Sequence, residues 1–319
     1  AVSGIVEIIG GTTVDIYVSV PRFPPGTGAE FGRATLAHCD RAANLSVGGN
    51  GGLAAYILGR LGQPARLHTR LGRDFWGGWL RARLEAAGVE LASDSTDEES
   101  STNIVATDGG GNRLSFFHPL EARYAVAAPL PDTRVMFLGG CPHPTAELMA
   151  SYFQPYRNAG ATTVMDIGPA IPRPFRFDDL ARLADALDLV TCNRAELRQL
   201  SGTSSLRRGV QLIHKLGIPT LVIKDGANGA VFSTSHDKHL HLVPVETTEP
   251  ATGSVGAGDS FNAGLLYALA NAKSVAVAVA FANQIARDVL RATDRLNVDL
   301  TASSIHETAV ADQVRLMEV

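Results

Sequence analysis

Short runs of apolar, often β-branched residues alternate along the chain with longer segments in which apolar residues recur three and four positions apart. The first pattern is typical of buried strands and the second of amphipathic helices. Strands are predicted at residues 5–9, 65–72, 135–140, 162–168, 187–193 and 220–226. Helices are predicted at residues 51–62, 75–88, 146–159, 178–186, 194–200 and 205–217, and residues 257–292 are predicted to be mostly helical. This alternation predicts an α/β fold in which helices cover both faces of a mainly parallel sheet.

Two segments depart from this alternation. Residues 12–38 and 100–118 each place strand-like sequence on both sides of a turn rich in glycine or proline, as a β-hairpin does. We interpret them as insertions that form one small sheet, a lid over a cleft in the main domain. The α/β core would then comprise residues 1–11, 39–99 and 119–319. The alternative is that both segments are edge strands of the main sheet.

Composition and charge narrow the classes of function. The chain has 319 residues and a net charge of −4 at pH 7, so we do not expect a nucleic-acid partner. The three cysteines, Cys39, Cys141 and Cys192, lie far apart in the sequence. This spacing argues against a disulfide framework and favours a reducing, cytoplasmic setting. The sequence has no run of about 18 apolar residues, and we therefore expect no membrane span.

The stretch GSVGAGDSFN, residues 253–262, places three glycines and one carboxylate, Asp259, at the start of an apolar helix. In a parallel sheet, ligands bind where strands end and helices begin. Glycine lets backbone N–H groups approach a ligand, and the first turn of a helix attracts anions. Asp259 is therefore either a helix cap or a general base. In the second case it takes a proton from a substrate hydroxyl while the glycine amides stabilise a phosphoryl group in transfer.

Other signatures of phosphate and cofactor binding are absent from the sequence. None of the four lysines follows a glycine, which excludes a Walker A loop. The stretch GGNGG, residues 48–52, lacks the GxGxxG spacing of a dinucleotide site, so a nicotinamide enzyme is a weak alternative. The HExxH and GxSxG motifs of metalloproteases and hydrolases are also absent.

Motifs along nearly the whole chain resemble those of the ribokinase-like sugar kinases, also called the phosphofructokinase-B family. GGNGGLAAYILGRLG is similar to the N-terminal signature of that family, and LGRDFWGGWLRARLEAAGVEL is similar to the helix that follows it. CNRAEL matches the family's Asn-x-x-Glu motif, VIKDGANGA its nucleotide-binding strand and turn, and GAGDSFNAG its glycine loop. FANQIA is similar to the helix beside the adenine pocket.

The resemblance implies a three-layer α/β/α sandwich with a small β-sheet lid. It also implies transfer of the γ-phosphoryl group of ATP to a hydroxyl of a small sugar or polyol. Asp259 would be the general base, and the amides of Gly256, Ala257 and Gly258 would form the anion hole. A nucleoside kinase of the same fold is the first alternative, and a sensor that binds a sugar or nucleotide without catalysis is the second.

The resemblance further implies ligand-binding residues. Asn193 and Glu196 would organise Mg²⁺ and its waters, and their spacing places both on one face of a helix. The alternative for this pair is an N-cap residue with its capping-box partner. ATP would contact Lys224, Gly226, Gly229 and Asn283. The acceptor would contact Asp15, Gly48, Gly49 and Asn50, whose backbone, amide and carboxylate groups suit a polyhydroxy molecule.

The second predicted hairpin carries two further candidates for acceptor binding, Phe116 and His118. Because strand side chains alternate between faces, one of Phe116 and Phe117 must point away from the other. Plain packing within the lid is an equal alternative for the aromatic side chain. An exposed apolar lid face would favour a homodimer joined through the lids.

Three departures from the family pattern change what we expect. Residues 253–255 replace a common Asp-Thr-Thr, which leaves a monovalent-cation site in doubt. Asp166 is retained in MDIGPA, but Gly168 and Ala170 stand where many relatives have Asn and Arg. This weakens the case for an acidic or phosphorylated acceptor. Leu53 replaces an Asn that is frequent in the first signature.

Overall fold

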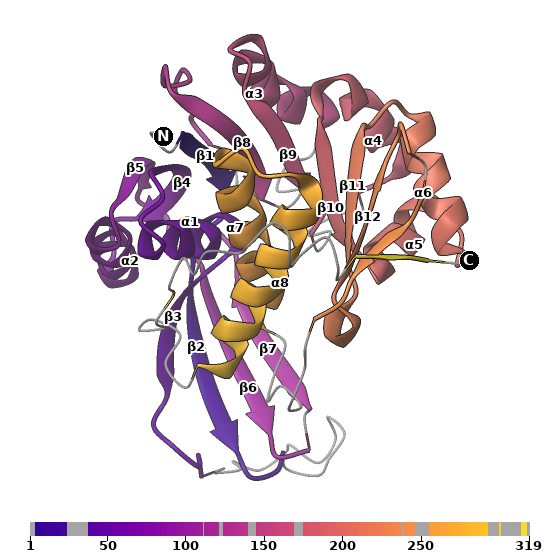
Figure 1. Cartoon of the computed structure of the whole chain (residues 1–319). Helices are drawn as coiled ribbons and strands as arrows, with labels where there is room; N and C mark the ends of the chain where they lie inside the picture. The colour runs from indigo at the N-terminus through magenta and orange to yellow at the C-terminus, as the bar shows by residue number, and fades with distance from the viewer. Residues whose placement is uncertain are drawn as a thin grey trace.

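The computed structural model of the chain describes residues 4–23, 38–110, 112–120, 124–139, 145–168, 175–237, 239–245, 255–292, 300 and 314–317. These residues form a ten-stranded sheet with helices on both faces and a separate four-stranded sheet. The small sheet extends from one end of the large one (Figure 1). The α/β fold predicted from the alternation of strands and helices is therefore confirmed.

The large sheet has the strand order β14-β13-β12-β11-β10-β9-β8-β1-β4-β5. Its parallel strands are β1 (Ile5–Gly10), β4 (Ala65–Gly72), β5 (Val89–Thr96), β8 (Thr133–Gly139), β9 (Thr162–Asp166), β10 (Leu189–Asn193) and β11 (Thr220–Lys224). Three antiparallel strands extend one edge: β12 (Ala230–Thr234), β13 (His241–Val243) and β14 (Arg315–Leu316). Helices bury the inner parallel strands on both sides, which explains the largely apolar sequences of β1, β8 and β10.

Each face of the large sheet has its own apolar core. The first core contains side chains of α1 (Asn50–Arg60), α2 (Phe75–Ala86), α7 (Ala257–Ala270) and α8 (Val275–Arg291). The second contains side chains of α3 (Ala146–Asn158), α4 (Phe177–Leu183), α5 (Arg194–Ser201) and α6 (Leu206–Lys215). The short 3₁₀ helices η1 (Ala184–Ala186) and η2 (Gly226–Asn228) complete the described helical elements. Figure 1 shows α7 and α8 side by side across the front of the sheet.

Two glycine contacts let helices approach close to neighbouring backbone. A Cβ on Gly264 of α7 would lie 2.7 Å from the Cα of Ala282 in α8. A Cβ on Gly51 of α1 would lie 2.7 Å from the Cα of Gly10, the last residue of β1. Because real Cβ atoms do not tolerate such distances, glycine at these positions sets how closely α7 and α1 pack around the end of the sheet.

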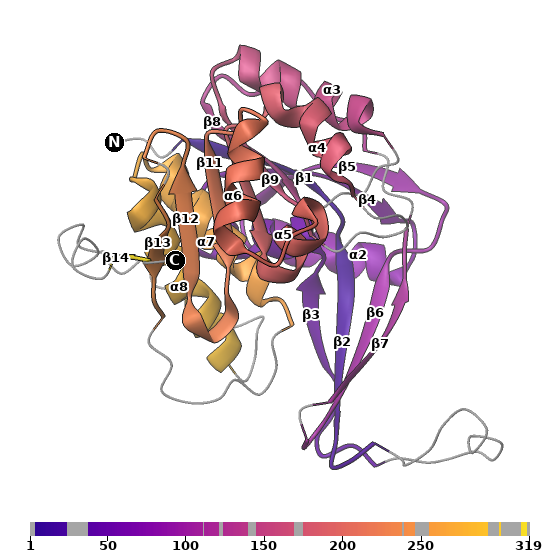
Figure 2. The same ribbon diagram turned by 90° about the vertical axis from the view of Figure 1, so that its right-hand side faces the viewer.

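The small sheet has the strand order β3-β2-β6-β7. Its strands are β2 (Thr13–Val20), β3 (Asn44–Gly48), β6 (Thr102–Asp108) and β7 (Arg113–His118). The two hairpins β2–β3 and β6–β7 join through parallel pairing of β2 with β6. The segments predicted as insertions thus meet in one separate sheet (Figure 2), and the alternative of edge strands in the main sheet is wrong.

The first hairpin extends further along the chain than expected. Its return strand β3 begins at Asn44, beyond residue 38, where the first insertion was expected to end. The later part of the segment predicted as the first hairpin, residues 24–37, lies outside the described residues.

Hydrogen bonds join the small sheet to the core at its base. The Asp74 carboxylate accepts bonds from the Gly77 amide at 2.7 Å, the Ser100 amide at 2.8 Å and the Ser100 hydroxyl at 2.7 Å. These bonds join the start of α2 to the segment that enters β6. The hydroxyls of Thr12 and Thr69 lie 2.9 Å apart and join the other entry to β4. Polar contacts therefore hold both segments that connect the core to the small sheet, the one before β2 and the one before β6.

A buried ionic network surrounds Glu7, which interrupts the apolar pattern of strand β1 in the large sheet. Arg66 binds the Glu7 carboxylate through two hydrogen bonds of 2.7 and 2.6 Å, and His68 lies 2.8 Å away. The other donors to this carboxylate are the amide of Leu130 and the hydroxyls of Thr133 and Tyr156. Burial by itself would raise the pKa of Glu7, but the hydrogen bonds from His68 and Arg66 outweigh it and lower the pKa to about 2.

We expect Glu7→Gln to lower the free energy of unfolding by about 3–5 kcal/mol, because it leaves the Arg66 cation buried without its counter-ion. The matched control is Glu85→Gln, since the Glu85 carboxylate is exposed 3.8 Å from Arg81 and should contribute less than about 1 kcal/mol. Urea unfolding at pH 7 measures both values.

The pH dependence gives a second test of the same network. A depressed carboxyl pKa stabilises the fold above its unfolded value of 4.5, and this contribution disappears as the pH falls toward about 2. The variant should lose stability less steeply over that range than the native chain. Equal losses for Glu7→Gln and Glu85→Gln, or parallel acid profiles, would contradict the role of the network.

Candidate active site

The helix α7 begins with an N-cap that has no side chain. Gly256 occupies the N-cap with φ 76° and ψ −2°, a left-handed conformation that favours glycine. Gly256 has no side chain, and within the described residues no side-chain hydrogen bond caps this helix, so the first N–H groups of α7 are available to an anion. Asp259 is therefore not the N-cap residue, which was its alternative role. It is the third residue of the helix and lies in its first turn.

Two charged side chains from the ends of parallel strands meet near this helix start. Asp166 is the last residue of β9, and Lys224 is the last residue of β11. The Lys224 Nζ lies 2.7 Å from Asp166 Oδ1, and the two side chains are 14% and 4% exposed. A Cβ placed on Gly258 would lie 3.6 Å from the same Nζ, which locates the ammonium group against the first turn of α7.

The pKa of Asp259 is raised to about 7. Burial is the main cause, and the negative charge of Asp166 is the next, with smaller contributions from Asp15 and Glu196. Lys224 acts in the opposite direction. A carboxyl group with this pKa can accept a proton near neutral pH and release it again, which is what general-base catalysis requires.

Asp15 of strand β2 in the small sheet is one of the charges that act on Asp259. It is buried, and its carboxylate accepts hydrogen bonds from the Tyr17 hydroxyl at 3.1 Å and the Asn103 amide at 3.4 Å. A Cβ on Gly48 would lie 2.3 Å from the Asp15 carboxylate, so the carboxylate packs on the Gly48 backbone. The structure thus brings together Asp15 and Gly48, two of the residues predicted to bind the acceptor.

The start of α1 places the next two predicted acceptor residues. Gly49 is the N-cap of α1 and has φ 81°, and Asn50 is the first residue of the helix. A Cβ on Gly49 would lie 2.4 Å from the carbonyl oxygen of Gly11, so only glycine fits this junction between β1 and the small sheet.

The register of β7 corrects the prediction for Phe116 and His118. Asp15 pairs with Asn103, and Asn103 pairs with Phe117, so Phe117 is the aromatic residue on the Asp15 face. Phe116 pairs with Ile104 and is 57% exposed on the opposite face, which it shares with His118. The sequence could not distinguish the two phenylalanines, because the choice depends on how β6 aligns with β2.

Asn193 and Glu196 form a reciprocal cap at the start of α5. The backbone N–H of Asn193 donates to Glu196 Oε2 at 2.7 Å, and the backbone N–H of Glu196 donates to Asn193 Oδ1 at 2.8 Å. The capping box that was the alternative role of this pair is thus present. Burial and the charge of Asp166 raise the pKa of Glu196. A cation beside this carboxylate would relieve that repulsion.

The donor set suits a magnesium ion only together with a phosphate ligand. Among the described residues, no group of three or more His, Cys, Asp or Glu side chains could hold a metal ion. Mg²⁺ normally keeps several waters and is bound by one or two carboxylates plus substrate phosphates. The second carboxylate oxygen of Glu196 is compatible with that arrangement.

Two of the four residues predicted to contact ATP, Gly229 and Asn283, meet at the Val243 carbonyl of β13. Gly229 ends the turn after β11 with φ 95°, and a Cβ there would lie 2.2 Å from the carbonyl oxygen of Val243. The Asn283 side chain of α8 donates to the same carbonyl at 2.9 Å. Gly226 opens the turn with φ 58°. Lys224 instead binds Asp166, at the opposite end of the turn.

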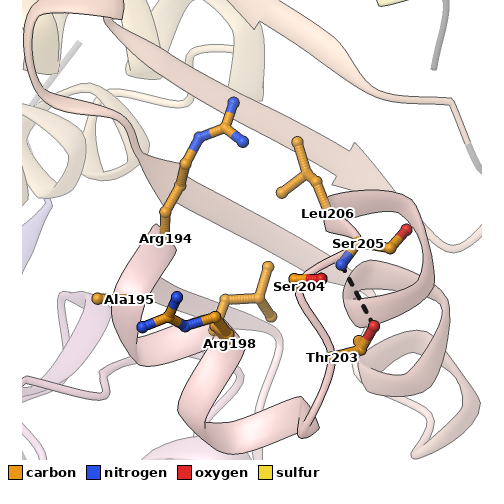
Figure 3. A pocket seen from close by; sticks show the side chains of 8 residues that line it. Arg194, Ala195, Arg198, Thr203, Ser204, Ser205 and Leu206 are labelled. Atoms are coloured by element: carbon orange, nitrogen blue, oxygen red, sulfur yellow. Dashed lines mark hydrogen bonds between the residues drawn. The ribbon is translucent and has the colours of Figure 1, made fainter.

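The described residues also contain a cavity of about 350 Å³ between α5 and the loop that enters α6 (Figure 3). Its walls include Arg194, Arg198 and the hydroxyl side chains at 203–205. Arg194 pairs with Asp225 at 2.6 Å. None of the charged groups around Asp259 lines this cavity, so it is separate from the candidate site.

Comparison with known proteins identifies the family. The sequence model of the pfkB family of carbohydrate kinases matches residues 7–295. The chain belongs to this family. The chain is thus a carbohydrate kinase, which transfers a phosphoryl group from ATP to an alcohol group.

Relatives of this kinase are named both as sugar kinases and as nucleoside kinases. A nucleoside kinase of Methanothermobacter thermautotrophicus is 26% identical over 287 residues, which cover 87% of this chain and 86% of the relative. A ribokinase of Arabidopsis thaliana is 25% identical over 84% of this chain and 71% of its own length.

Solved structures support the fold. The Arabidopsis thaliana ribokinase in complex with ribose and ATP has a TM-score of 0.74 at 21% identity, over 92% of this kinase and 95% of that chain. The Burkholderia thailandensis nucleoside kinase in complex with inosine has a TM-score of 0.71 at 20% identity, over 97% of each chain. At these identities the likeness establishes a common fold.

Three features of the site were not predicted from the sequence of this kinase: the pairing of Asp166 with Lys224, and the roles of Tyr17 and Asn103 beside Asp15. The sequence does show a carboxylate at the end of one strand and a lysine at the end of another, which was the available signal for the first. The residues at 169–174 and 246–254, which include Ala170 and two of the three positions of the doubtful monovalent-cation site, lie outside the described residues. In the described part of the chain, every helix is too short or too polar to cross a membrane.

We expect Asp259→Asn to stabilise the nucleotide-free kinase at alkaline pH. The folded chain keeps the Asp259 proton up to about pH 7, whereas the unfolded chain loses it near pH 4, so the native chain loses stability as the pH rises between these values. The variant avoids this loss and should be more stable by roughly 2 kcal/mol at about pH 8.5. Chemical unfolding at several pH values measures the difference.

The control for this prediction is Asp185→Asn, an exposed aspartate of η1. Its stability should follow the native profile at every pH. If the advantage of Asp259→Asn were the same at pH 4.5 and at pH 8.5, the raised pKa of Asp259 would be refuted.

Proposed function

We propose that the chain is a Mg²⁺- and ATP-dependent kinase that phosphorylates a hydroxyl of a small sugar or polyol, with Asp259 as the general base. One observation carries the proposal: a carboxyl group with a pKa near 7 lies in the first turn of a helix whose N-cap, Gly256, has no side chain to bind the helix N–H groups. A proton acceptor and an anion site therefore occupy the same helix turn.

The proposed mechanism uses these two features together. The acceptor hydroxyl attacks the γ-phosphorus in line with the leaving ADP oxygen, and its proton passes to the Asp259 carboxylate. The amides of Gly256, Ala257 and Gly258 stabilise the charge on the phosphoryl oxygens. These amides are fixed by the helix before the reaction, so they need little reorganisation as the charge develops.

The nucleotide and the metal complete the proposal. Lys224, Gly226, Gly229 and Asn283 line the proposed ATP site. Mg²⁺ would bind near Asn193 and Glu196 and would neutralise charge on the phosphates. Asn193 Oδ1 and Glu196 Oε2 are both used in the helix cap, so the metal would be bound through the second carboxylate oxygen of Glu196.

The proposed acceptor site combines two parts of the chain. Asp15 presents a carboxylate already oriented by Tyr17 and Asn103, and a polyhydroxy molecule can donate to it. Gly48, Gly49 and Asn50 supply backbone and amide groups from the start of α1. We propose that the small sheet, formed by β2, β3, β6 and β7, acts as a lid that covers this site.

A nucleoside is the second candidate acceptor. Phe117 lies on the same face as Asp15 and is 48% exposed, so it could stack on a nucleobase while Asp15 binds the ribose hydroxyls. The 26% identical nucleoside kinase agrees with this alternative.

Turnover of Asp259→Asn tests the base assignment. We expect kcat to fall by about 10²–10⁴-fold or more, because the amide cannot accept the proton, while the dissociation constant for ATP stays within about twofold. Asp185→Asn should keep the native kcat. Acceptor-dependent release of ADP and calorimetric titration with ATP supply the two measurements, and an active Asn variant would overturn the assignment.

A screen of sugars, polyols and nucleosides in the same ADP assay separates the candidate functions. Turnover with a sugar or polyol supports the main proposal, and turnover restricted to nucleosides supports the second. Binding of ATP and an acceptor without any turnover would favour the non-catalytic sensor.

We further propose that two copies associate through their lids in the cytoplasm. Ile104, Leu114 and Phe116 are 40%, 49% and 57% exposed on one face of the small sheet, which leaves an apolar surface in water. Cys39 and Cys192 are both free thiols, as a reducing compartment allows.

The dimer can be tested by sedimentation. We expect the native chain to sediment as a dimer and Phe116→Ser to shift it toward monomer, because the substitution removes the most exposed of the three apolar side chains. Phe75→Ser is the control, since Phe75 is 74% exposed but belongs to α2. A native chain that is monomeric at all concentrations would exclude the interface.

A further inference from the structure

We infer that Asp166 is a positioning residue of the transfer reaction: its carboxylate holds the Lys224 ammonium against the first turn of α7 and places a negative charge beside the base Asp259. This inference rests on the proposed kinase function for its kinetic consequences. Its structural consequences can be measured without turnover.

The first argument is the path of the ion pair across the sheet. Asp166 and Lys224 end strands β9 and β11, which are separated by β10. Neighbouring strands lie about 4.8 Å apart, so the pair must bridge roughly twice that distance. The long lysine side chain spans most of it and reaches the carboxylate at 2.7 Å. Among the described residues, Lys224 is the only donor of a hydrogen bond to the Asp166 carboxylate.

The second argument is the electrostatic character of the place where the ammonium lies. The start of a helix carries a partial positive charge, which disfavours a cation and favours an anion. Lys224 Nζ nevertheless lies 3.6 Å from the position of a Cβ on Gly258, in the first turn of α7. The buried carboxylate of Asp166 supplies the anion that makes this position favourable. A phosphoryl group arriving at α7 would then meet both the helix amides and an ammonium already in place.

The third argument concerns the groups that face Asp259. They come from four elements: Asp15 on β2, Asp166 on β9, Glu196 on α5 and Lys224 on β11. Burial contributes most to the raised pKa of Asp259, and Asp166 contributes the largest of the charge effects. Lys224 lowers the same pKa. Asp166 and Lys224 therefore bind each other yet act on the base in opposite directions.

This opposition gives a test that a merely structural role would not pass. We expect Asp166→Asn to move the acid limb of the pH profile of kcat/KM to lower pH by about one unit, and Lys224→Met to move it to higher pH. Both variants should also lower kcat, because the ammonium is released or removed. A residue that only supports the fold would lower kcat and leave the limb where it is.

Conservative variants are the matched controls. Asp166→Glu keeps the negative charge and Lys224→Arg keeps the positive one, so both should retain the acid limb of the native kinase. If Asp166→Asn and Lys224→Met shift the limb in the same direction, or not at all, the inference is overturned.

A second measurement does not depend on activity. In the nucleotide-free chain, the stability gained by Asp259→Asn on going from pH 4.5 to pH 8.5 reports the pKa of Asp259. This gain should shrink in the Asp166→Asn background and grow in the Lys224→Met background. If the acceptor screen finds no substrate, the proposed kinase function fails, but these unfolding profiles still decide whether Asp166 and Lys224 set the charge state of Asp259. If Asp166→Asn does not fold, the test rests on the Lys224→Met background, in which the stability gain of Asp259→Asn should grow.

Discussion

The site near the start of α7 contains four carboxylates and one lysine, and its properties depend on this excess of negative charge. Asp15, Asp166 and Glu196 each repel a negative charge on Asp259, and in the described part of the chain Lys224 forms an ion pair with Asp166 alone. The repulsion costs stability, but it also keeps Asp259 able to exchange a proton near neutral pH. The same cluster would attract a cation bound to phosphates, since added positive charge removes the repulsion. Stability lost in the unliganded chain is thus linked to function in the liganded one.

The large sheet contains a second group of buried charges, and it is arranged in the opposite way. Glu7 is completely buried, yet its carboxylate is satisfied by Arg66, His68 and three further donors. Its pKa is lowered, whereas that of Asp259 is raised. The difference lies in the partners: Glu7 has a bidentate arginine of its own, whereas Asp259 has no side-chain hydrogen bond among the described residues. A strand interior favours the first arrangement and a ligand site the second.

The acceptor side of the site depends on pairing between distant parts of the chain. Parallel pairing of β2 with β6 places Asn103 beside Asp15, 88 positions away in the sequence. The same pairing decides that Phe117, rather than Phe116, shares the face with Asp15. A shift of one residue in this register would exchange the two faces of the small sheet. One register therefore determines both that Phe117 lies on the Asp15 face and that the opposite face of the small sheet is apolar.

The sequence by itself determined the family, the α/β fold, the separate small sheet and most strands and helices of the core, because apolar periodicity and helix boundaries are local properties. It did not indicate β5 (Val89–Thr96), whose residues alternate with polar ones, or the position of β3 beyond residue 38. Among the site residues, it singled out Asp259 and the glycines before it from their place at a helix start. Only the tertiary structure decided that Asp166 binds Lys224 across β10 and that Phe117 faces Asp15. These contacts join strands that are far apart in the sequence, and strand order and register, which no local pattern encodes, bring them together.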